Sequence, residues 1–588
     1  MRSLIQRIQR DPGLALLALA LAAATAIYVP SLGRGLVNYD DPWLYTDNTL
    51  LHHPSWSAVV TVFTDLDSHA RFQLSPEYLP VRDLSVMADY AIWGNHYAGF
   101  HLTSLLIYLG AIAIWWCALT ELGISREVAG IALLLWAVHP SHAESVAWLA
   151  ERKGVLGMLW AGTCALGYAR FRAGKSAWWL AFALVGGVAA VWSKAIAAFA
   201  VAALGPLELA LPARRVSWRR SLTGLGTIAL CAGLAYIPVV LLAVRWSIVG
   251  GATGAFPASR LAAVVGVHGF YLRLAGATLA NAVSYPIATA GPSAVDLAIG
   301  ALGFVAAIVA LVRGSAALRA AAVIWLFGWL PVGHLLLPLQ MVFVADRYLL
   351  VASLGFTLAL AVGIAQVPRL RWALLAALVV GFGVRAVDAQ LTWRSDVELW
   401  QRAAAVNPDD ANAWFMYVEA LDQAGRPGEA ARVVDEAFTH VRTPRLVMHA
   451  GLVAFADGRP ADGLALMTEA AVGGEPRAMA NLANELAGQG QLPRALLWAR
   501  LAAAVAPSYA NGHRIEGKVA RLIDRYSIES RRAFERAYAL EPDVATNRYN
   551  LGIALADAGE RERGRALLES CLGDREVGRL ARLALDHL

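Results

Sequence analysis

The chain has 588 residues, of which 58% are hydrophobic and 16% are charged, whereas a soluble globular protein carries about a quarter charged residues. Residues 1–389 hold 43 of the 94 charged residues, and residues 390–588 hold the other 51. This distribution excludes a disordered chain, a collagen-like chain and a small disulfide scaffold. It predicts a large membrane domain followed by a water-facing domain.

The net charge of +6 does not indicate nucleic-acid binding. The basic residues form short clusters between apolar runs, which is how membrane topology distributes them. The four cysteines are scattered without metal-ligand spacing. No zinc or disulfide framework is therefore expected.

A membrane-spanning helix needs about 20 apolar residues. Eleven runs come near this length, at residues 12–30, 100–121, 127–140, 154–170, 177–192, 195–211, 221–244, 294–312, 317–338, 347–366 and 370–389. No clear cleavage site follows the basic N-terminus, so the first run is predicted to be an uncleaved helix. Basic residues collect in alternate loops, which predicts a cytoplasmic N-terminus and an outer C-terminal domain.

Two outer segments are long. Residues 31–99 carry eight acidic residues against three arginines, Arg34, Arg71 and Arg82, and long loops on a rigid scaffold often carry function. A full span at 264–285 would move the later basic loops to the outer side. Residues 247–293 are therefore predicted to form an outer loop with a surface or re-entrant helix.

Asp40 and Asp41 follow the first span directly and precede Pro42. Two adjacent carboxylates at a membrane surface can bind a cation, orient a lipid phosphate through one, or supply a general base. Asp and Pro also favour turns, so a solvated turn remains the alternative.

Other candidate groups lie on the same predicted outer side. His139, His142 and Glu144 are close in sequence, and two of them three or five residues apart could share one face and bind a metal. No further ligand that would complete such a site is evident nearby. The alternative is a structural role in which a histidine caps a helix. Lys194 lies in a short turn between two spans, where a lone cation is costly unless it is paired or reaches the surface. Arg152 and Lys153 can meet a phosphate through charge-assisted bonds or sit among lipid headgroups. Asp346-Arg347-Tyr348 can form an ion pair within the chain or part of an anion site.

The C-terminal part repeats itself. Pro408, Pro444, Pro476, Pro507 and Pro542 recur at intervals of 36, 32, 31 and 35 residues. A period near 34 residues with helix–turn–helix character is typical of tetratricopeptide repeats, which stack into an α-solenoid with a concave binding face. The repeats are expected to bind a peptide or partner, with a passive cap as the alternative.

Five strings occur in an order that matches a known family: Val37-Asn-Tyr-Asp-Asp-Pro42, Gly99-Phe-His-Leu102, Val138-His-Pro-Ser-His-Ala-Glu-Ser-Val-Ala-Trp148, Ser193-Lys194 and Phe343-Val-Ala-Asp-Arg-Tyr-Leu349. Together with the repeats they resemble the transmembrane and tetratricopeptide-repeat O-mannosyltransferases and their bacterial relatives, which are GT-C glycosyltransferases. The resemblance covers most of the chain. It implies an all-α fold, with a polytopic GT-C domain at 1–390 and a repeat domain at 391–588.

The resemblance implies a role for each matching position. Asp41 or Asp40 is the expected catalytic base, with Asp41 preferred. The expected donor phosphate-binding residues are Arg152, Lys194, Arg347 and Arg82. The expected pocket residues are His101, His142, Glu144, Asp346 and Tyr348. The chain departs from the family at Tyr78-Leu79-Pro80-Val81, at Ala195 after Lys194, and at Asp346 before Arg347, so the resemblance does not fix the sugar.

The implied activity is inverting transfer of a sugar from a polyprenyl-phosphate donor to a hydroxyl group. The acceptor is expected to be Ser or Thr of a protein held by the repeats, as in O-mannosylation. No cofactor is certain, and a divalent cation is left open. The alternatives are a polysaccharide or lipid glycosyltransferase and a non-catalytic scaffold for envelope assembly. The low lysine content favours a bacterial inner membrane, with the repeats in the periplasm.

Overall fold

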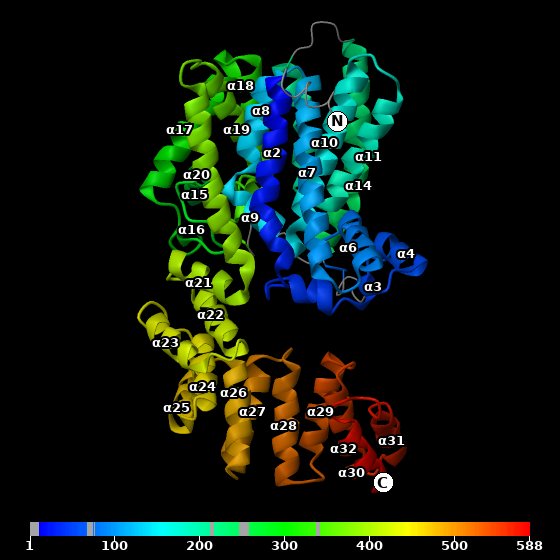
Figure 1. Ribbon diagram of the computed structural model, residues 1–588. Coiled ribbons are helices and arrows are strands. Elements are labelled where there is room, and N and C mark those ends of the chain that lie inside the picture. The colour runs from blue at the N-terminus through cyan, green and yellow to red at the C-terminus, as the bar shows by residue number, and fades with distance from the viewer. Residues whose placement is uncertain (1–10, 68–73, 76, 212–216, 246–257, 337–341) are drawn as a thin grey trace. The chain divides into compact units, whose positions relative to one another are not determined.

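The computed structural model describes residues 11–67, 74–75, 77–211, 217–245, 258–336 and 342–588. The basic residues before Asp11 and Arg71 lie outside this range. All regular elements are helices, and no strand occurs among the described residues, so the all-α prediction is confirmed (Figure 1). The chain divides into two compact units, residues 1–407 and 408–588. The first unit thus continues past residue 390.

The first unit is built on long helices. Its main helices are α2 (Pro12–Tyr28), α7 (Tyr97–Glu121), α8 (Arg126–Ala137), α10 (Arg152–Arg172), α11 (Trp178–Ser193), α12 (Ala197–Ala202), α13 (Leu204–Ala210), α14 (Trp218–Arg245), α15 (Ala258–Ala275), α17 (Ala294–Arg313), α18 (Ala316–Trp329), α19 (Leu349–Ala365) and α20 (Arg371–Leu391). A helix lies at each of the eleven apolar runs that the sequence contains.

Among the described residues, six helices are long and apolar enough to cross a membrane, fewer than the eleven spans predicted. These six contain α2, α7, α14, α17, α19 and α20. The other five runs fall short for physical reasons. α8, α11 and α18 have only 12, 16 and 14 residues, the run at 195–211 is divided between α12 and α13, and α10 carries charged residues at both ends.

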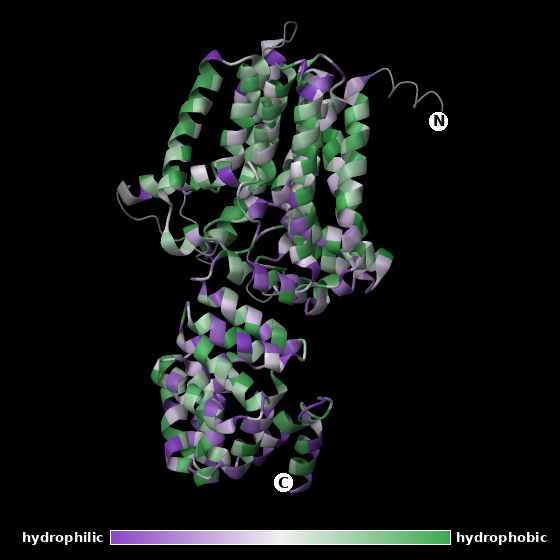
Figure 2. Ribbon diagram, turned by 60° about the vertical axis from the view of Figure 1, so that its left-hand side comes forward, coloured by the Kyte–Doolittle hydropathy of each residue, from purple (hydrophilic) through white to green (hydrophobic). Residues whose placement is uncertain are grey.

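The outward faces of the long helices are apolar. On α14, Leu230 is 62% exposed and Val244 is 70% exposed, and on α17 Leu302 is 69% exposed. Figure 2 shows apolar residues along most of the length of these helices. Because large apolar patches are rare on water-facing surfaces, these faces fit a lipid environment.

Residues 247–293, predicted to form an outer loop with a surface or re-entrant helix, contain the well-packed helix α15. Its position relative to the membrane stays a prediction. α15 runs against α17 (Figure 1), and glycines make the close approach possible. A Cβ atom on Gly269 would lie 1.8 Å from the carbonyl oxygen of Asp296, and one on Gly300 would lie 1.9 Å from that of Val265. Small residues at helix interfaces bring backbones together in this way in membranes.

Short elements gather at one end of the first unit, which we call the loop end (Figure 1). They are α3 (Thr49–His52), α4 (Trp56–Thr64), α6 (Pro80–Trp93), α16 (Pro286–Ala290), α21 (Asp396–Val406), the π-helix η2 (Pro42–Thr46) and the 3₁₀-helices η4 (Leu149–Glu151), η5 (Asp346–Tyr348) and η6 (Thr392–Arg394). The charged residues that the sequence singled out lie among these elements.

The second unit consists of helix pairs with the predicted spacing. They are α22 (Ala411–Gln423) with α23 (Pro427–Phe438), α24 (Pro444–Ala456) with α25 (Pro460–Val472), α26 (Pro476–Gly488) with α27 (Leu492–Val505), α28 (Ala510–Ile523) with α29 (Ile528–Leu540) and α30 (Ala545–Asp557) with α31 (Arg561–Glu569), followed by α32 (Gly578–Asp586). Gly425 and Gly458 end α22 and α24 with positive φ angles of 70° and 73°, which glycine adopts readily. The predicted helical repeats are therefore present.

Candidate functional site

The two adjacent aspartates of the first loop have opposite environments. Asp41 is 1% exposed, and its carboxylate accepts hydrogen bonds from the backbone N–H groups of Val37 (3.1 Å) and Ala150 (2.9 Å). Burial raises the pKa of Asp41 to about 7, although the two N–H donors oppose this shift. Asp40 is exposed. Only Asp40 can reach a molecule that arrives from outside.

Asp41 connects the first loop to the start of α10. Ala150 lies in η4, and the hydroxyl of Tyr45 donates to the carbonyl oxygen of Leu149 in the same short helix (2.9 Å). The next residue, Glu151, is fully buried. The contact at Asp41 therefore holds the first loop beside Glu151, which pairs with Lys194.

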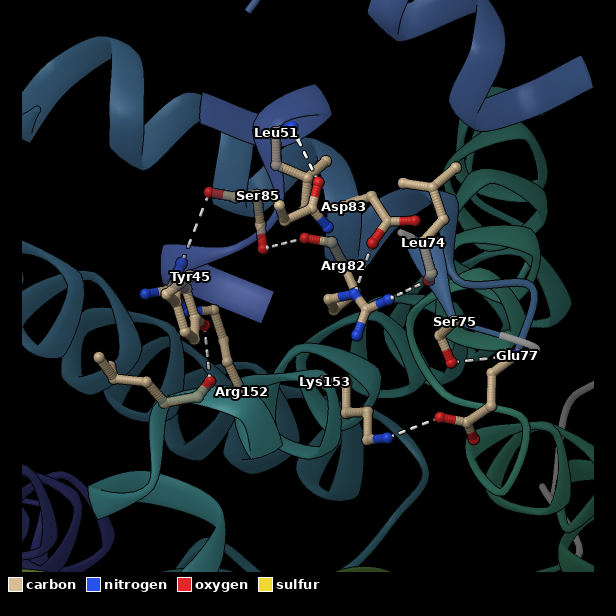
Figure 3. Close-up of polar contacts among 12 residues, drawn as sticks. Tyr45, Leu51, Leu74, Ser75, Glu77, Arg82, Asp83, Ser85, Arg152 and Lys153 are labelled. Carbon is tan, nitrogen blue, oxygen red and sulfur yellow. Dashed lines mark hydrogen bonds and ion pairs between the residues drawn. The ribbon is translucent and has the colours of Figure 1, made fainter. Parts of the chain in front are cut away.

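Two cations, Lys153 and Arg347, lie near Asp40, and a third, Lys194, lies near these two. Each of the three is paired with a glutamate. Lys153 Nζ lies 2.6 Å from Glu77 Oε2, as Figure 3 shows. Lys194 pairs with Glu151, and the guanidinium group of Arg347 pairs with Glu144. We call these six residues the charged cluster.

Glu151 also links two of the cations. Its second carboxylate oxygen lies 3.9 Å from Arg347 Nε. The backbone N–H of Arg347 in turn donates to Glu144 (2.7 Å). Burial lowers the pKa of Lys194, and the nearby positive charges of Lys153 and Arg347 lower it further, while Glu151 opposes the shift.

Asp40 faces this cluster. Loss of water contacts raises the pKa of Asp40, the positive charges of Lys153 and Arg347 lower it, and the negative charges of Glu151 and Glu77 raise it. A carboxylate with a raised pKa is a stronger base than a fully hydrated one. The arrangement can therefore take up a proton at Asp40 beside a group of cations that can hold an anion.

Two of the predicted phosphate-binding residues point into the protein. Arg82 is 2% exposed, pairs with Asp83 (2.6 Å) and donates to the carbonyl oxygen of Leu74 (2.9 Å). Arg152 is 1% exposed and pairs with Asp89. It also donates to Ser104 Oγ (2.9 Å) and to the carbonyl oxygen of Phe100 (2.7 Å). The contacts of Arg152 join α6, α7 and α10, and Figure 3 shows those of Arg82 with Asp83 and Leu74. Neither guanidinium group faces outward.

The predicted pocket residues do not form one pocket. His142 is fully buried between the hydroxyl groups of Tyr108 (2.8 Å) and Ser353 (2.9 Å), and His101 is 2% exposed within α7. Asp346 accepts hydrogen bonds from Asn281 (2.7 Å) and Tyr285. Glu144 and Tyr348 contact Arg347. Among the described residues, no group of three His, Cys, Asp or Glu side chains could hold a metal ion.

Aromatic side chains form a wall beside Asp40. Tyr39 contacts Trp148, Trp393 and Trp400, with ring centroids 4.9, 6.4 and 5.6 Å apart. Trp148 and Trp393 stack at 5.1 Å, and the Arg347 guanidinium carbon lies 5.6 Å from the Trp148 ring centre. Trp393 and Trp400 follow α20, so the segment leading to the repeats helps to shape the site.

A small pocket lies at the charged cluster, and a separate apolar groove is lined by the residues that follow in α12. Lys194, Arg347 and Tyr348 line a small pocket, and its apolar walls come from Met158, Ile196, Ala197, Leu350 and Val351. The next residues of α12, Ala198 and Phe199, line a groove of about 490 Å³ between α12–α13 and α14. Neighbouring residues of α12, Ala197 and Ala198, thus line the small pocket and the groove.

Sequence reasoning missed three residues of the site, Tyr39, Glu77 and Glu151. It raised Lys153 as a residue that could meet a phosphate, but chose Arg152 for that role. Lys153 is one of only four lysines in the chain, and this rarity was the one signal that favoured it over Arg152. The glutamates carried no comparable signal, because their partners are far away in the sequence.

No protein-family model matches the chain, and no curated protein matches it. Among solved structures, the crystal structure of the yeast Tom70 is similar, with 10% sequence identity and a TM-score of 0.28; the similarity covers 74% of this chain and 91% of that chain.

Proposed function

We propose that the chain is a membrane glycosyltransferase of the GT-C type. It moves a sugar from a polyprenyl-phosphate donor to the hydroxyl group of Ser or Thr in a protein, on the outer face of a bacterial inner membrane. The observation that carries this proposal is the exposed Asp40 near Lys153 and Arg347, with Lys194 and Arg347 lining a small pocket whose other walls are largely apolar. A lipid-linked phosphate needs a cationic surface for its phosphate and an apolar surface for its lipid chain.

In the proposed reaction, Asp40 removes the proton from the acceptor hydroxyl group. The oxygen attacks the anomeric carbon while the bond from that carbon to the phosphate oxygen breaks, and the electron pair leaves with the lipid phosphate. Lys153, Lys194 and Arg347 stabilise the negative charge that develops on the leaving group. A single displacement of this kind inverts the anomeric centre.

The assignment of the base moves from Asp41 to Asp40. Asp41 is buried and both of its carboxylate oxygens accept backbone hydrogen bonds, so it serves as a positioning residue for the loop. Likewise Lys153 takes the place of Arg152 and Arg82 among the phosphate-binding candidates. Lys194 and Arg347 keep that role.

The proposed topology has eleven spans, with the loop end on the outer side. The six long apolar helices support a membrane location. The five shorter or more polar helices pack against them, and a helix that lines a protein interior tolerates charge better than one facing lipid. The helical repeats follow on the outer side and present the acceptor chain.

The proposal is tested with purified full-length protein in lipid nanodiscs and a synthetic polyprenyl-phosphate mannose. We expect release of polyprenyl phosphate that depends on an added Ser- or Thr-containing peptide. The peptide product, followed by mass spectrometry, should gain one hexose. If mannose fails, other polyprenyl-phosphate sugars test the same site; no lipid phosphate release with any donor would support the scaffold alternative.

A further inference from the structure

The short helix α4 in the first loop has two contrasting faces. Ala58 and Val62 are buried, whereas Trp56 is 81% exposed and Val60 is 42% exposed. The members of each pair are four residues apart and so share a face. The helix contains no charged residue. A helix face in water normally carries charged or strongly polar side chains, so the exposed face of α4 is unusual for a solvated loop.

Contacts on both sides of α4 hold it at the loop end of two long helices. The ring of Phe63 lies 5.6 Å from that of Trp192, near the end of α11. The Trp192 indole N–H donates to the carbonyl oxygen of Ala235 in α14 (3.0 Å). After α4, Asp67 pairs with Arg245 (3.1 Å), the last residue of α14.

The exposed apolar surface of α14 reaches this anchoring point. Its large exposed apolar residues are Leu222, Leu230, Leu234, Ile237, Val240, Leu241 and Val244. Val244 is directly followed by Arg245, which holds the segment after α4. The apolar surface of α14 therefore extends to the end of the helix that holds the segment after α4. Tryptophan is enriched where such surfaces meet water.

We infer that α4 lies in the outer membrane interface, with Trp56 and Val60 in contact with lipid. This inference rests on the membrane placement in the proposed function, but not on the glycosyl transfer. The partner of this face is lipid rather than a protein, because the exposed apolar surface of α14 extends to Val244, next to the residue that anchors the segment after α4.

The same helix is tied to the charged cluster. The hydroxyl group of Tyr78 donates to the carbonyl oxygen of Phe63 (2.9 Å), and the Tyr78 ring also contacts Trp192 at 6.1 Å. Glu77, the partner of Lys153, is the preceding residue. A helix seated at the lipid surface therefore sets the height of the Glu77–Lys153 pair relative to the lipid headgroups.

The experiment uses the full chain in nanodiscs of phosphatidylethanolamine and phosphatidylglycerol. The four native cysteines are replaced by serine or alanine, and a fluorescent probe is attached at V60C. Two matched valine positions serve as controls: V240C on α14, where the valine is 47% exposed, and V472C on α25, where it is 73% exposed. Quenching is measured with a lipid-attached nitroxide and with aqueous iodide.

We expect the lipid nitroxide to quench the probe at position 60 several-fold more strongly than at position 472, and iodide to quench it less. Two results overturn the inference: iodide quenching equal to that at position 472, which means a solvated helix, or protection from both quenchers, which means a protein cover. If the lipid nitroxide reaches position 240 but not position 60, only this inference fails. If it does not reach position 240, the membrane placement fails as well.

Discussion

At the residue scale, Asp40 and Asp41 differ in exposure although they are neighbours. Asp40 is exposed and Asp41 is 1% exposed. Because Asp40 is the proposed base, we expect D40N to lower turnover by about 10²-fold or more while the melting temperature stays unchanged. D41N should instead lower the melting temperature, because an amide cannot accept both backbone N–H groups.

The matched control for this pair is D47N, which changes an exposed acid of the same loop. It should leave both turnover and melting temperature unchanged. Turnover is measured as lipid phosphate release, and folding by fluorescence-detected thermal unfolding. Full activity in D40N together with loss of activity in a stably folded D41N would return the role of base to Asp41.

The raised pKa of Asp41 also predicts a pH dependence of stability. The folded chain keeps a proton on Asp41 up to a pKa of about 7, whereas the unfolded chain releases it near pH 4. The folded state therefore binds more protons between these values, and its stability falls as pH rises, by up to about 1.4 kcal/mol per pH unit from this group. Thermal unfolding between pH 5 and pH 8 should show a component of this sign in the native chain that is missing in D41N.

At the scale of elements, the packing of α15 on α17 depends on glycine. G269A would place a methyl group against the carbonyl oxygen of Asp296, so the two helices must separate. We expect a loss of about 1–3 kcal/mol in unfolding free energy, as for other overpacked interiors.

The control is G381A on α20, where a Cβ atom has no neighbour within 4 Å. This change should be neutral or stabilising by up to about 1 kcal/mol, since alanine favours helix. Melting temperatures in detergent would compare the two variants. An unchanged melting temperature in G269A would contradict the close packing.

Much of the element level could be predicted from the sequence. The eleven apolar runs coincide with helices, because continuous hydrophobicity over a helical length is a local property. The spacing of the helical repeats could also be predicted from the sequence, since Pro444 and Pro476 begin helices and Gly425 and Gly458 end them. The shortness of α8 was already visible in the short run at 127–140. The break between α12 and α13 could not be predicted, because packing sets where these helices end.

The candidate site could be predicted only in part. Asp40, Lys194 and Arg347 were singled out from the sequence, and Arg347 lies near each of the other two. The inward direction of Arg152 was not predictable, because it depends on Asp89 and Ser104, which lie on other helices. The choice between Asp40 and Asp41 depends on Ala150, 109 residues further along the chain. The catalytic roles of these residues stay predictions.

At the scale of the whole molecule, the boundary between the units determines which truncations fold. The first unit ends at Asn407, and Trp393 and Trp400 are 5% and 4% exposed within it. A chain truncated after Asn407 should therefore keep its monodispersity and melting temperature. A chain truncated after residue 390 loses both tryptophans from the aromatic wall and should lose several kcal/mol of stability, as large-to-small changes in cores do.

Size-exclusion chromatography and thermal unfolding of the two truncated chains give the comparison directly. Equal stability would mean that residues 391–407 do not support the first unit. In the proposed function, the chain that ends at Asn407 should still transfer sugar to a short peptide, because Asp40 and the charged cluster remain in place.

The pairing of Lys153, Lys194 and Arg347 with three glutamates has a consequence for the catalytic cycle. A phosphate that enters the charged cluster must displace carboxylate contacts, and the carboxylates compete for the same cations when the reaction is over. The proposed enzyme would thus hold its lipid phosphate product weakly and release it quickly. Cations without such partners would retain that product, and product inhibition would then limit turnover.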